Sequence, residues 1–466
     1  MDSPPDLSCK YVTPDLPQWY YRIAVSAERA ASNCFTGAEN GDEYRDTAAV
    51  QALLAAEGKA DDAEVGDVVF GLSTLAMGDH NATTYAQCGH VQLLRDAGAM
   101  PAECMMTYRG VPPAGKVHEG VVIDDHAVAA AVPRRGWKRS TAGQRARELH
   151  EAGRRAYEAI GVPDVAAKRQ DGLRTAVVWG CELQGDRGRA GGPRTRRAAL
   201  AALTLALCLA RVATPELLGR VLGLWTDLLL YRRAAYAVLS AAYQFLHRYR
   251  DEPETARTLT GPVISELLGL VCLAPLLDSP LRAPVDRNVK ASDASPSGAA
   301  VVAVTVPQEA ADELWRQRVR PGGRTNCAVI GAPGNTRGDS ATGELLESLP
   351  AREMLRFAFG NKRPPHINVG EMRSRRALWR TLAQDPRAHC RRHLVAYDSS
   401  ATVGSSNKGR SPKTGMLREA RLTYPYLFAA DCTEGTLWTD SERMPADGPS
   451  RGGHVQFPAP QREWVA

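Results

Sequence analysis

Two groups of acidic side chains lie in order along this chain of 466 residues, in settings that suit metal-ion chemistry. The first is the pair Asp124 and Asp125, which follows the apolar run at residues 121–123. Neighbouring side chains of a strand point to opposite faces, so an Asp pair at a strand end or tight turn can direct one carboxylate into a site. With a third carboxylate, the pair could hold two divalent cations about 3.5–4 Å apart, which stabilise the attacking and leaving oxygens of a displacement at phosphorus. A surface turn is the commoner use of this dipeptide, and both interpretations are open for the pair alone.

The second group consists of four carboxylates, each in a segment of its own. If these carboxylates converge from their separate elements, they could hold divalent cations such as Mg²⁺, which prefers oxygen ligands. Each residue also has an ordinary alternative, as part of a turn, as a charge at a helix N-terminus, or as an N-cap. In chain order the four are Asp293, Glu371, Asp398 and Asp447.

The spacing of apolar residues predicts the elements that position these groups. Residues 1–180 mix short apolar runs with polar turns, which is typical of α+β structure. Residues 182–197 are rich in Gly and Arg and predict an exposed loop. Residues 198–281 repeat apolar side chains at helical spacing and predict a bundle of about four helices. Residues 318–343 are rich in Gly, Pro, Asn and Arg and predict a long loop.

Three segments should frame the second acidic group. Residues 299–304 form an apolar run that fits a buried strand. Residues 372–382 have helical spacing and follow Glu371, and residues 393–397 are typical of a strand that ends at Asp398.

Composition favours an anionic partner without requiring one. The hydrophobic fraction of 44% and the charged fraction of 24% are those of a soluble globular protein, and the net charge is +6. Arginine is dense at residues 187–197, 373–380 and 387–392, although a run of charge can also be a solvated face. The ten cysteines include no Cys-x-x-Cys pair, so we expect free thiols in a reducing compartment and no structural zinc site.

Nothing in the sequence predicts a membrane partner. Residues 1–10 lack the apolar core of a signal peptide, and the apolar stretch at residues 198–210 is too short to span a bilayer. We therefore expect an intracellular protein, either cytoplasmic or nuclear.

Several segments around the Asp pair resemble the palm of retroelement reverse transcriptases. Asp15 followed by the aromatic stretch at residues 19–21 is similar to the first palm motif. Residues 75–79, Leu-Ala-Met-Gly-Asp, are similar to the turn that leads into a helix beside the incoming nucleotide. Residues 167–169 and 177–183 resemble the remaining palm motifs, the last of which grips the primer end.

This resemblance assigns roles to individual residues. Asp15, Asp124 and Asp125 would be metal ligands, and Tyr20 would stand where the family excludes a ribose 2′-hydroxyl. Met77 and Gly78 would line the nucleotide site. Three features depart from the family: Val122 stands where an aromatic residue is usual, Ala76 replaces a Pro, and only fourteen residues precede Asp15. The resemblance therefore predicts that the fingers are largely absent.

The second acidic group resembles the ribonuclease H of retroelements, including hepadnavirus-like and tyrosine-recombinase elements. The matching stretches are Asp-Ala-Ser-Pro-Ser-Gly from Asp293, His-Ile-Asn-Val-Gly-Glu ending at Glu371, and the apolar run that ends at Asp398. Lys-Gly-Arg-Ser at residues 408–411 and Pro-Ala-Asp-Gly-Pro-Ser-Arg at residues 445–451 complete the set. Met444 replaces an Asn of the family pattern.

Together the two resemblances imply an α+β chain in three parts. They are a truncated reverse transcriptase palm at residues 1–183, a helical thumb or connection at 184–283, and an α/β ribonuclease H-like domain at 284–455. An insertion is expected around residues 305–362. The implied activities are RNA-directed DNA polymerisation and ribonuclease H cleavage, with two Mg²⁺ (or Mn²⁺) ions per active site.

The implied partners are an RNA template, a DNA primer, dNTPs and the RNA–DNA hybrid. Three alternatives are open: a chain in which only the ribonuclease H works, a decayed retroelement protein that only binds nucleic acid, and an unrelated helical scaffold. Six cations are candidate contacts to the nucleic-acid backbone: Arg373, Arg375, Arg376, Lys408, Arg410 and Lys413.

Overall fold

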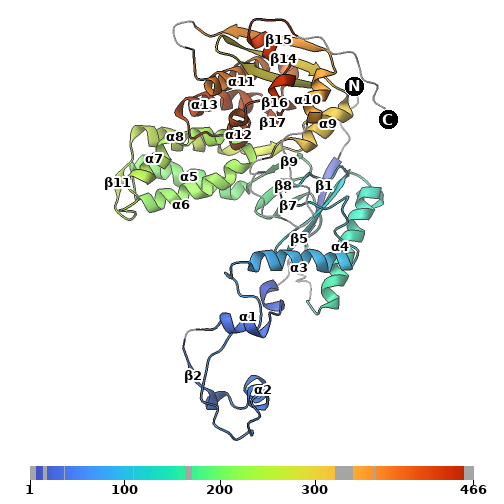
Figure 1. The fold of residues 1–466 in the computed structure, drawn as a ribbon, viewed down its shortest axis with the longest axis vertical. Helices are drawn as coiled ribbons and strands as arrows, with labels where there is room; N and C mark the ends of the chain where they lie inside the picture. Colours follow the sequence, from blue (N-terminus) through green and yellow to red (C-terminus); the bar gives the residue numbers. More distant parts are fainter. Residues whose placement is uncertain are drawn as a thin grey trace.

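The fold is taken from a computed structural model, which describes residues 7–13, 18–35, 37–108, 110–162, 170–320, 340–360 and 364–455. Helices and strands are mixed along the chain, as the α+β prediction requires. Figure 1 shows a sheet-containing part below, a helical part to one side, and a second sheet with its helices at the top. Within the described residues, no helix is both long enough and apolar enough to span a bilayer.

The first sheet carries the Asp pair. Its strand order is β4-β5-β1-β6, and the neighbours whose pairing is resolved are antiparallel. Two helices pack against it, α3 (Ala82–Asp96) and α4 (Thr141–Ala159), and the side chain of Ser140 caps α4 by accepting the Gly143 amide. The strands are β1 (Leu7–Thr13), β4 (Val117–Val122), β5 (Asp125–Pro133) and β6 (Gln170–Leu173).

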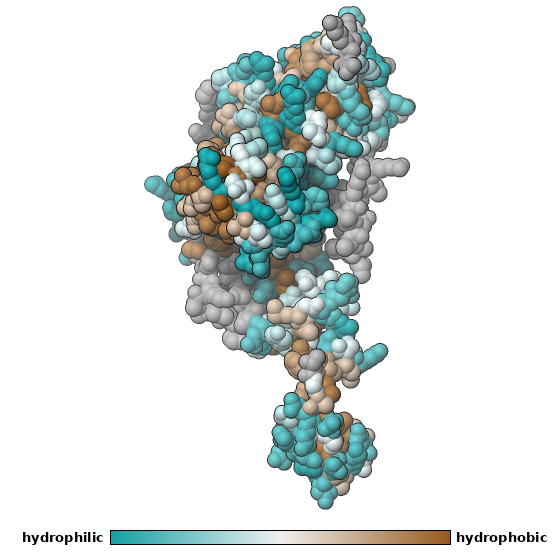
Figure 2. Space-filling model, turned by 90° about the vertical axis from the view of Figure 1, so that its left-hand side faces the viewer, coloured by the Kyte–Doolittle hydropathy of each residue, from teal (hydrophilic) through white to brown (hydrophobic). Residues whose placement is uncertain are grey.

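Residues 24–74 extend away from this sheet as an arm, which is the lowest part of Figure 1. The arm contains α1 (Ala27–Ser32), β2 (Glu39–Asn40), α2 (Ala48–Ala56) and β3 (Asp67–Val68). It carries ten acidic and three basic side chains, a net charge of −7 in a chain whose net charge is +6. Its surface is mostly hydrophilic on the face shown in Figure 2.

Residues 182–197 are not the exposed loop that their composition predicted. They contribute β8 (Cys181–Gln184), β9 (Arg189–Gly191) and the start of α5 (Arg194–Ala210). With β7 (Thr175–Val178) and β12 (Asp278–Pro280), these strands form a sheet of order β12-β9-β8-β7. The buried Glu182 carboxylate accepts the backbone N–H and the Nε–H of Arg194, each at 2.7 Å, so it stabilises the start of α5.

Four helices lie where the apolar spacing predicted a bundle. They are α5, α6 (Pro215–Leu229), α7 (Ala241–Arg248) and α8 (Gly261–Leu273). Trp225 is fully buried among them and donates from Nε1 to Thr204 Oγ1 at 2.8 Å. The outer face keeps exposed apolar side chains, such as Leu209.

Ion pairs join this bundle to the C-terminal part. Arg232 lies against Asp431 at 2.7 Å, and Arg421 contacts Glu266 at 2.9 Å while donating to Ala237 O at 3.0 Å. Arg232 is buried, so its ion pair with Asp431 is screened little by salt.

The C-terminal sheet has the order β15-β14-β13-β16-β17. Strands β13, β14 and β15 are antiparallel neighbours, whereas β13, β16 and β17 run parallel. Their bounds are β13 (Asn288–Ala294), β14 (Gly298–Thr305), β15 (Ala351–Ala358), β16 (Arg392–Tyr397) and β17 (Thr433–Trp438).

Helices cover both faces of this sheet, which explains why its central strands β13, β14 and β16 are buried along nearly their whole length. On β16, Leu394 and Ala396 face α9 (Gln308–Gln317) and α10 (Ser340–Glu347). Val395 and Tyr397 face α11 (Ile367–Gln384) and α13 (Thr414–Ala429).

The region expected as an insertion, residues 305–362, is partly a component of the sheet. β15 pairs with β14, and Ala311 of α9 is fully buried against the sheet core. These elements have a low apolar content of their own, so they acquire a core position through pairing and docking, and the insertion itself stays a prediction. Residues 321–339 lie outside the described residues.

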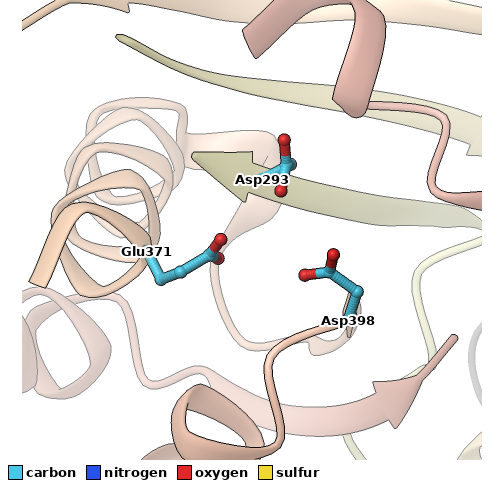
Figure 3. A group of neighbouring side chains, drawn as sticks. All are labelled: Asp293, Glu371 and Asp398. Carbon is cyan, nitrogen blue, oxygen red and sulfur yellow. The ribbon is translucent and has the colours of Figure 1, made fainter. Parts of the chain in front are cut away.

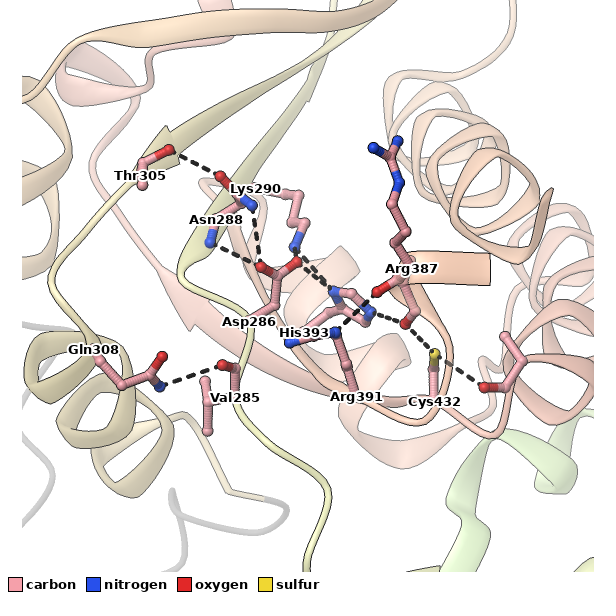
Figure 4. Close-up of polar contacts among 12 residues, drawn as sticks. Val285, Asp286, Asn288, Lys290, Thr305, Gln308, Arg387, Arg391, His393 and Cys432 are labelled. Atoms are coloured by element: carbon pink, nitrogen blue, oxygen red, sulfur yellow. Dashed lines mark hydrogen bonds and ion pairs between the residues drawn. The ribbon is translucent and has the colours of Figure 1, made fainter. Parts of the chain in front are cut away.

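A polar cluster lies buried at the start of β13 (Figure 4). Lys290 Nζ is 2.5 Å from Asp286 Oδ2 and 2.9 Å from His393 Nδ1, and Lys290 is 1% exposed. His393 Nε2 is 2.8 Å from Ala388 O, and the Cys432 thiol also donates to that carbonyl. The cluster gives the buried Lys290 ammonium group its hydrogen-bond partners. Because Lys290 lies on β13 and His393 on β16, the contact between them favours the pairing of these two strands.

Candidate metal centre

Three of the predicted carboxylates meet at one end of the C-terminal sheet. Asp293 is next to the last residue of β13, Asp398 follows the end of β16, and Glu371 lies in the second turn of α11. Because β13 and β16 are parallel neighbours, with Ala291 beside Ala396, their carboxyl ends bring the two aspartates together. One ligand oxygen from each of the three residues lies within 4.8 Å of the others. Figure 3 shows the three carboxylates pointing toward one another.

Asp293 and Glu371 are buried, and Asp398 is half-buried. Glu371 is 2% exposed; its Oε1 accepts the Ala294 N–H at 3.2 Å, while its Oε2 has no hydrogen-bond partner among the described residues. Burial, with added repulsion from Asp293 and Asp398, raises the pKa of Glu371 to about 9. A buried carboxylate with an unpaired oxygen is a group that a cation would stabilise.

Asp293 is also buried, but a hydroxyl group stabilises its charged form. Burial raises the pKa of Asp293 to about 6, and repulsion from Asp398 and Asp447 adds to this, while the hydrogen bond from Ser450 opposes it. Ser450 Oγ donates to Asp293 Oδ2 at 2.5 Å. The arrangement suits hard divalent cations such as Mg²⁺, which prefer carboxylate oxygens.

Asp447 lies beside these three residues rather than among them. It begins the short helix α14 (Asp447–Ser450), and its carboxylate accepts from Arg451 Nε at 2.8 Å. Electrostatic repulsion from Asp447 contributes to the raised pKa of Asp293. Ser295 Oγ donates to Ser450 O at 2.7 Å, and this hydrogen bond holds α14 against β13. The fourth predicted carboxylate is therefore adjacent to the group and paired with an arginine.

A buried polar network that the sequence did not reveal supports the site. The carboxylate of Glu434 on β17 accepts from Arg375 Nε and Nη2 at 2.9 and 2.6 Å, from Trp379 Nε1 at 2.8 Å and from the Tyr397 hydroxyl at 2.9 Å. Arg375 is 4% exposed. The prediction that Arg375 contacts a nucleic-acid backbone was therefore wrong, because its guanidinium is turned inward and neutralised.

The other five predicted backbone contacts lie nearer the surface. Arg373 and Arg376 share the buried carboxylate of Glu419, at 3.3 and 2.9 Å. Lys408, Arg410 and Lys413 are exposed, and they stay predictions as contacts to nucleic acid.

The Asp pair lies in the hairpin turn between β4 and β5. Asp124 is half-buried and Asp125 is exposed. Ile123, at the tip of this turn, has φ +58°, which a β-branched residue rarely adopts. Gln87 on α3 accepts the Ile123 N–H at 2.8 Å and donates to Val121 O at 3.0 Å, and His90 Nδ1 lies 2.8 Å from Ile123 O. Three hydrogen bonds from one helix thus hold the strained turn.

The remaining ligand predicted for this turn, Asp15, lies outside the described residues. Within them, no third carboxylate joins Asp124 and Asp125 in a group that could hold a metal ion. The predicted nucleotide-site residues gather near the start of α3. The Tyr20 hydroxyl is 3.4 Å from Thr83 Oγ1, one turn before Gln87, while Met77 is 66% exposed and Gly78 has φ +97°.

Comparisons with known proteins add little to this geometry. No protein-family model matches the chain, and no curated protein matches it. Among solved structures, it is similar to the foamy viral protease-reverse transcriptase dRH in complex with double-stranded DNA, at 10% identity and a TM-score of 0.36, covering 93% of this chain and 57% of that one.

Two further structures of the foamy viral protein give similar values. The complex with dsDNA has 12% identity and a TM-score of 0.37, covering 92% of this chain and 67% of that one. The complex with an RNA/DNA hybrid has 10% identity and a TM-score of 0.35, covering 95% and 67%. The chain thus spans between half and about two thirds of the length of these proteins, and at such TM-scores the likeness carries no argument.

Proposed function

We propose that the C-terminal part is a metal-dependent ribonuclease H that cuts the RNA strand of an RNA–DNA hybrid. The observation that supports this most directly is the convergence of Asp293, Glu371 and Asp398 at the carboxyl ends of neighbouring parallel strands. The sequence resemblance predicted these residues for this role, and a bound cation would stabilise the buried carboxylates of Asp293 and Glu371.

The proposed mechanism gives each side chain a defined part. Asp293, Glu371 and Asp398 would hold two divalent cations, with Asp447 beside them. When bound, such ions activate a water and stabilise the leaving 3′-oxygen. Ser450 orients Asp293, and Ser441 Oγ donates to Asp398 Oδ2 at 2.7 Å, so both carboxylates keep fixed directions. The hybrid would be recognised through phosphates and the 2′-hydroxyl rather than through base edges.

A second candidate function is nucleotidyl transfer at the β4–β5 turn. There a primer 3′-hydroxyl would attack the α-phosphate of a dNTP on an RNA template, with Asp15, Asp124 and Asp125 as ligands. Tyr20, Met77 and Gly78 would border the nucleotide. The observation that favours this is the strained Ile123 turn held by Gln87 and His90, because strain of this kind gathers at functional sites.

The test compares substrates. Purified protein is given a labelled RNA–DNA hybrid, an RNA duplex and a DNA duplex, each with Mg²⁺ or with EDTA, and primer extension is run in parallel. The proposal expects Mg²⁺-dependent loss of the RNA strand of the hybrid alone. Cleavage of the hybrid without primer extension would support the nuclease and contradict nucleotidyl transfer at the β4–β5 turn. No cleavage by folded protein would contradict the nuclease proposal and favour a protein that only binds nucleic acid.

A further inference from the structure

The stretch between β5 and α4 carries a concentration of positive charge. Residues 134–147 contain six Arg and Lys side chains and no Asp or Glu, so this stretch alone carries a charge equal to the net charge of the chain. Arg135, Lys138 and Arg139 are exposed, and no carboxylate of the described residues pairs with them. Unpaired cations at this density create a positive potential that attracts polyanions.

The local structure holds these cations in place. The Trp137 ring lies against the backbone of β6, where a Cβ added to Gly172 would come within 2.8 Å of it. Ser140 Oγ donates to Trp137 O at 2.6 Å, and Arg147 donates to Lys138 O at 2.7 Å. Since the indole ring is packed, it is not free to stack on a base, so this turn offers charge and little else.

A cavity next to this stretch has a lining that is mostly apolar and includes the acidic residue Glu103. The cavity has a volume of about 600 Å³, and its lining includes Lys116, the start of α4 at Thr141, Arg145 and, from α9, Arg316. Arg316 also donates to Pro112 O at 2.8 Å, which joins the two parts there. Figure 1 shows α4 and α9 on the side of the molecule opposite the helices α5 to α8.

Three more arginines gather beyond α9. The guanidinium carbons of Arg318 and Arg392 lie 4.1 and 5.3 Å from the centre of the Trp315 ring. Burial lowers the pKa of Arg318 to about 10, and repulsion from Arg320 and Arg392 adds to this.

Some of this charge is already balanced. Glu313 pairs with Arg316 at 2.7 Å, and Glu103 lies 3.5 Å from Arg145. Lys116, Arg135, Lys138 and Arg139 are exposed, and no ion pair to a carboxylate is found for them among the described residues, so these are the cations that the inference uses. We call Lys116, Arg135, Lys138 and Arg139 the basic face.

We propose that the basic face binds the phosphate backbone of a nucleic acid without reading its sequence. This rests on the proposed function, because it takes nucleic acid as the partner. The face lies at the end of β5 opposite the Asp124 turn. A strand of nine residues separates the two, roughly 30 Å at about 3.4 Å per residue, so the face is not part of the catalytic turn. It would hold a strand or duplex that extends beyond either site.

The test measures the binding of a fluorescently labelled RNA–DNA hybrid by anisotropy at several salt concentrations. The variant is Arg135→Gln, Lys138→Gln and Arg139→Gln combined. A matched control, Arg220→Gln, Arg248→Gln and Arg250→Gln, removes the same charge from exposed positions on α6 and around the end of α7. Each phosphate contact contributes about 0.9 to the slope of log K against log salt, so the variant slope should fall by about 2 to 3. The control should keep the wild-type slope, and two hybrids of different sequence should bind alike.

Separate outcomes distinguish the two claims. The triple variant could show the same salt slope as the wild type while the wild type still cleaves the hybrid. This result would overturn the proposal that the basic face binds nucleic acid, and the proposed nuclease function would stand. A wild type that neither binds nor cleaves the hybrid would overturn the proposed function as well. Poly-glutamate that binds the wild type as tightly as the hybrid, and loses this in the variant, would instead assign the face to an acidic protein surface.

Discussion

Replacing Glu371 by Gln should stabilise the metal-free protein while it abolishes nuclease activity. Burial and two neighbouring carboxylates raise the pKa of Glu371 to about 9, against a usual value of 4.5. An acid whose pKa is raised on folding destabilises the folded state increasingly as pH rises from its unfolded value toward its folded value. Glutamine has nearly the same shape, can still accept the Ala294 N–H, and has no proton to lose.

The size of the effect follows from the pKa shift. At pH 8, Glu371 stays protonated in the folded protein although the pH is about 3.5 units above its usual pKa. One unit corresponds to 1.36 kcal/mol, so this protonation lowers the free energy of unfolding by ~5 kcal/mol at most. At pH 5 the same reasoning gives less than ~1 kcal/mol. For a unit of this size, each kcal/mol moves Tm by about 2–4 °C. The gain in Tm should therefore have an upper limit of about 10–20 °C at pH 8 and of about 2–4 °C at pH 5.

Thermal unfolding in EDTA from pH 5 to pH 9 measures this, with exposed Glu442→Gln as the control. Mg²⁺ at 100 times its Kd should narrow the difference between the two proteins, because it stabilises the form that binds it by about 2.7 kcal/mol and Glu371→Gln would bind it weakly. A Glu371→Gln protein that is less stable than the wild type at every pH in EDTA would refute the reasoning.

Three further predictions concern the groups around the sites. Glu434→Gln should destabilise the protein by about 3–5 kcal/mol, because Arg375 would keep a buried charge without its partner, and denaturant unfolding measures this. Gln87→Leu should cost about 1–3 kcal/mol locally and speed hydrogen exchange at the Ile123 amide, with little change in the C-terminal part; unchanged exchange would show that the turn does not depend on α3. Burial alone would raise the pKa of Asp286, but hydrogen bonds and positive charge in its cluster hold this pKa well below its usual range. The carboxylate therefore stabilises the fold above about pH 4 and loses that effect as pH falls. Asp286→Asn should therefore lower Tm at pH 7, and a gap that stays constant down to pH 2 would contradict this.

The sequence predicted the central strands and helices of the C-terminal part because they are buried on both sides. The apolar run at residues 299–304 is β14, and the helical spacing after Glu371 is α11. The convergence of Asp293 and Asp398 required the parallel pairing of β13 and β16, which no local pattern reveals. Only the family resemblance brought these residues together at the sequence level.

Other features were missed because tertiary contacts decide them. Glu182 lies in a stretch whose Gly and Arg content suggested a loop, yet it is buried at the start of α5. Arg375 follows Glu371 by four residues and precedes Leu378 and Trp379 on the buried face of α11, so helical spacing could have placed it inside. The cluster around Lys290 gave no signal, because its partners come from segments about a hundred residues apart.

The most direct test of the nuclease proposal is the rate of hybrid cleavage in Mg²⁺ under single-turnover conditions, for the wild type, Asp398→Asn and Asp385→Asn. Asp385 is an aspartate of the same unit that pairs with Arg387 at the surface, away from the three carboxylates. The rate should fall by about 100-fold or more in Asp398→Asn, since even groups that only support a metal ligand contribute about 10- to 100-fold. Asp385→Asn should match the wild type. Equal rates in all three proteins would show that this group of carboxylates is not where the hybrid is cut.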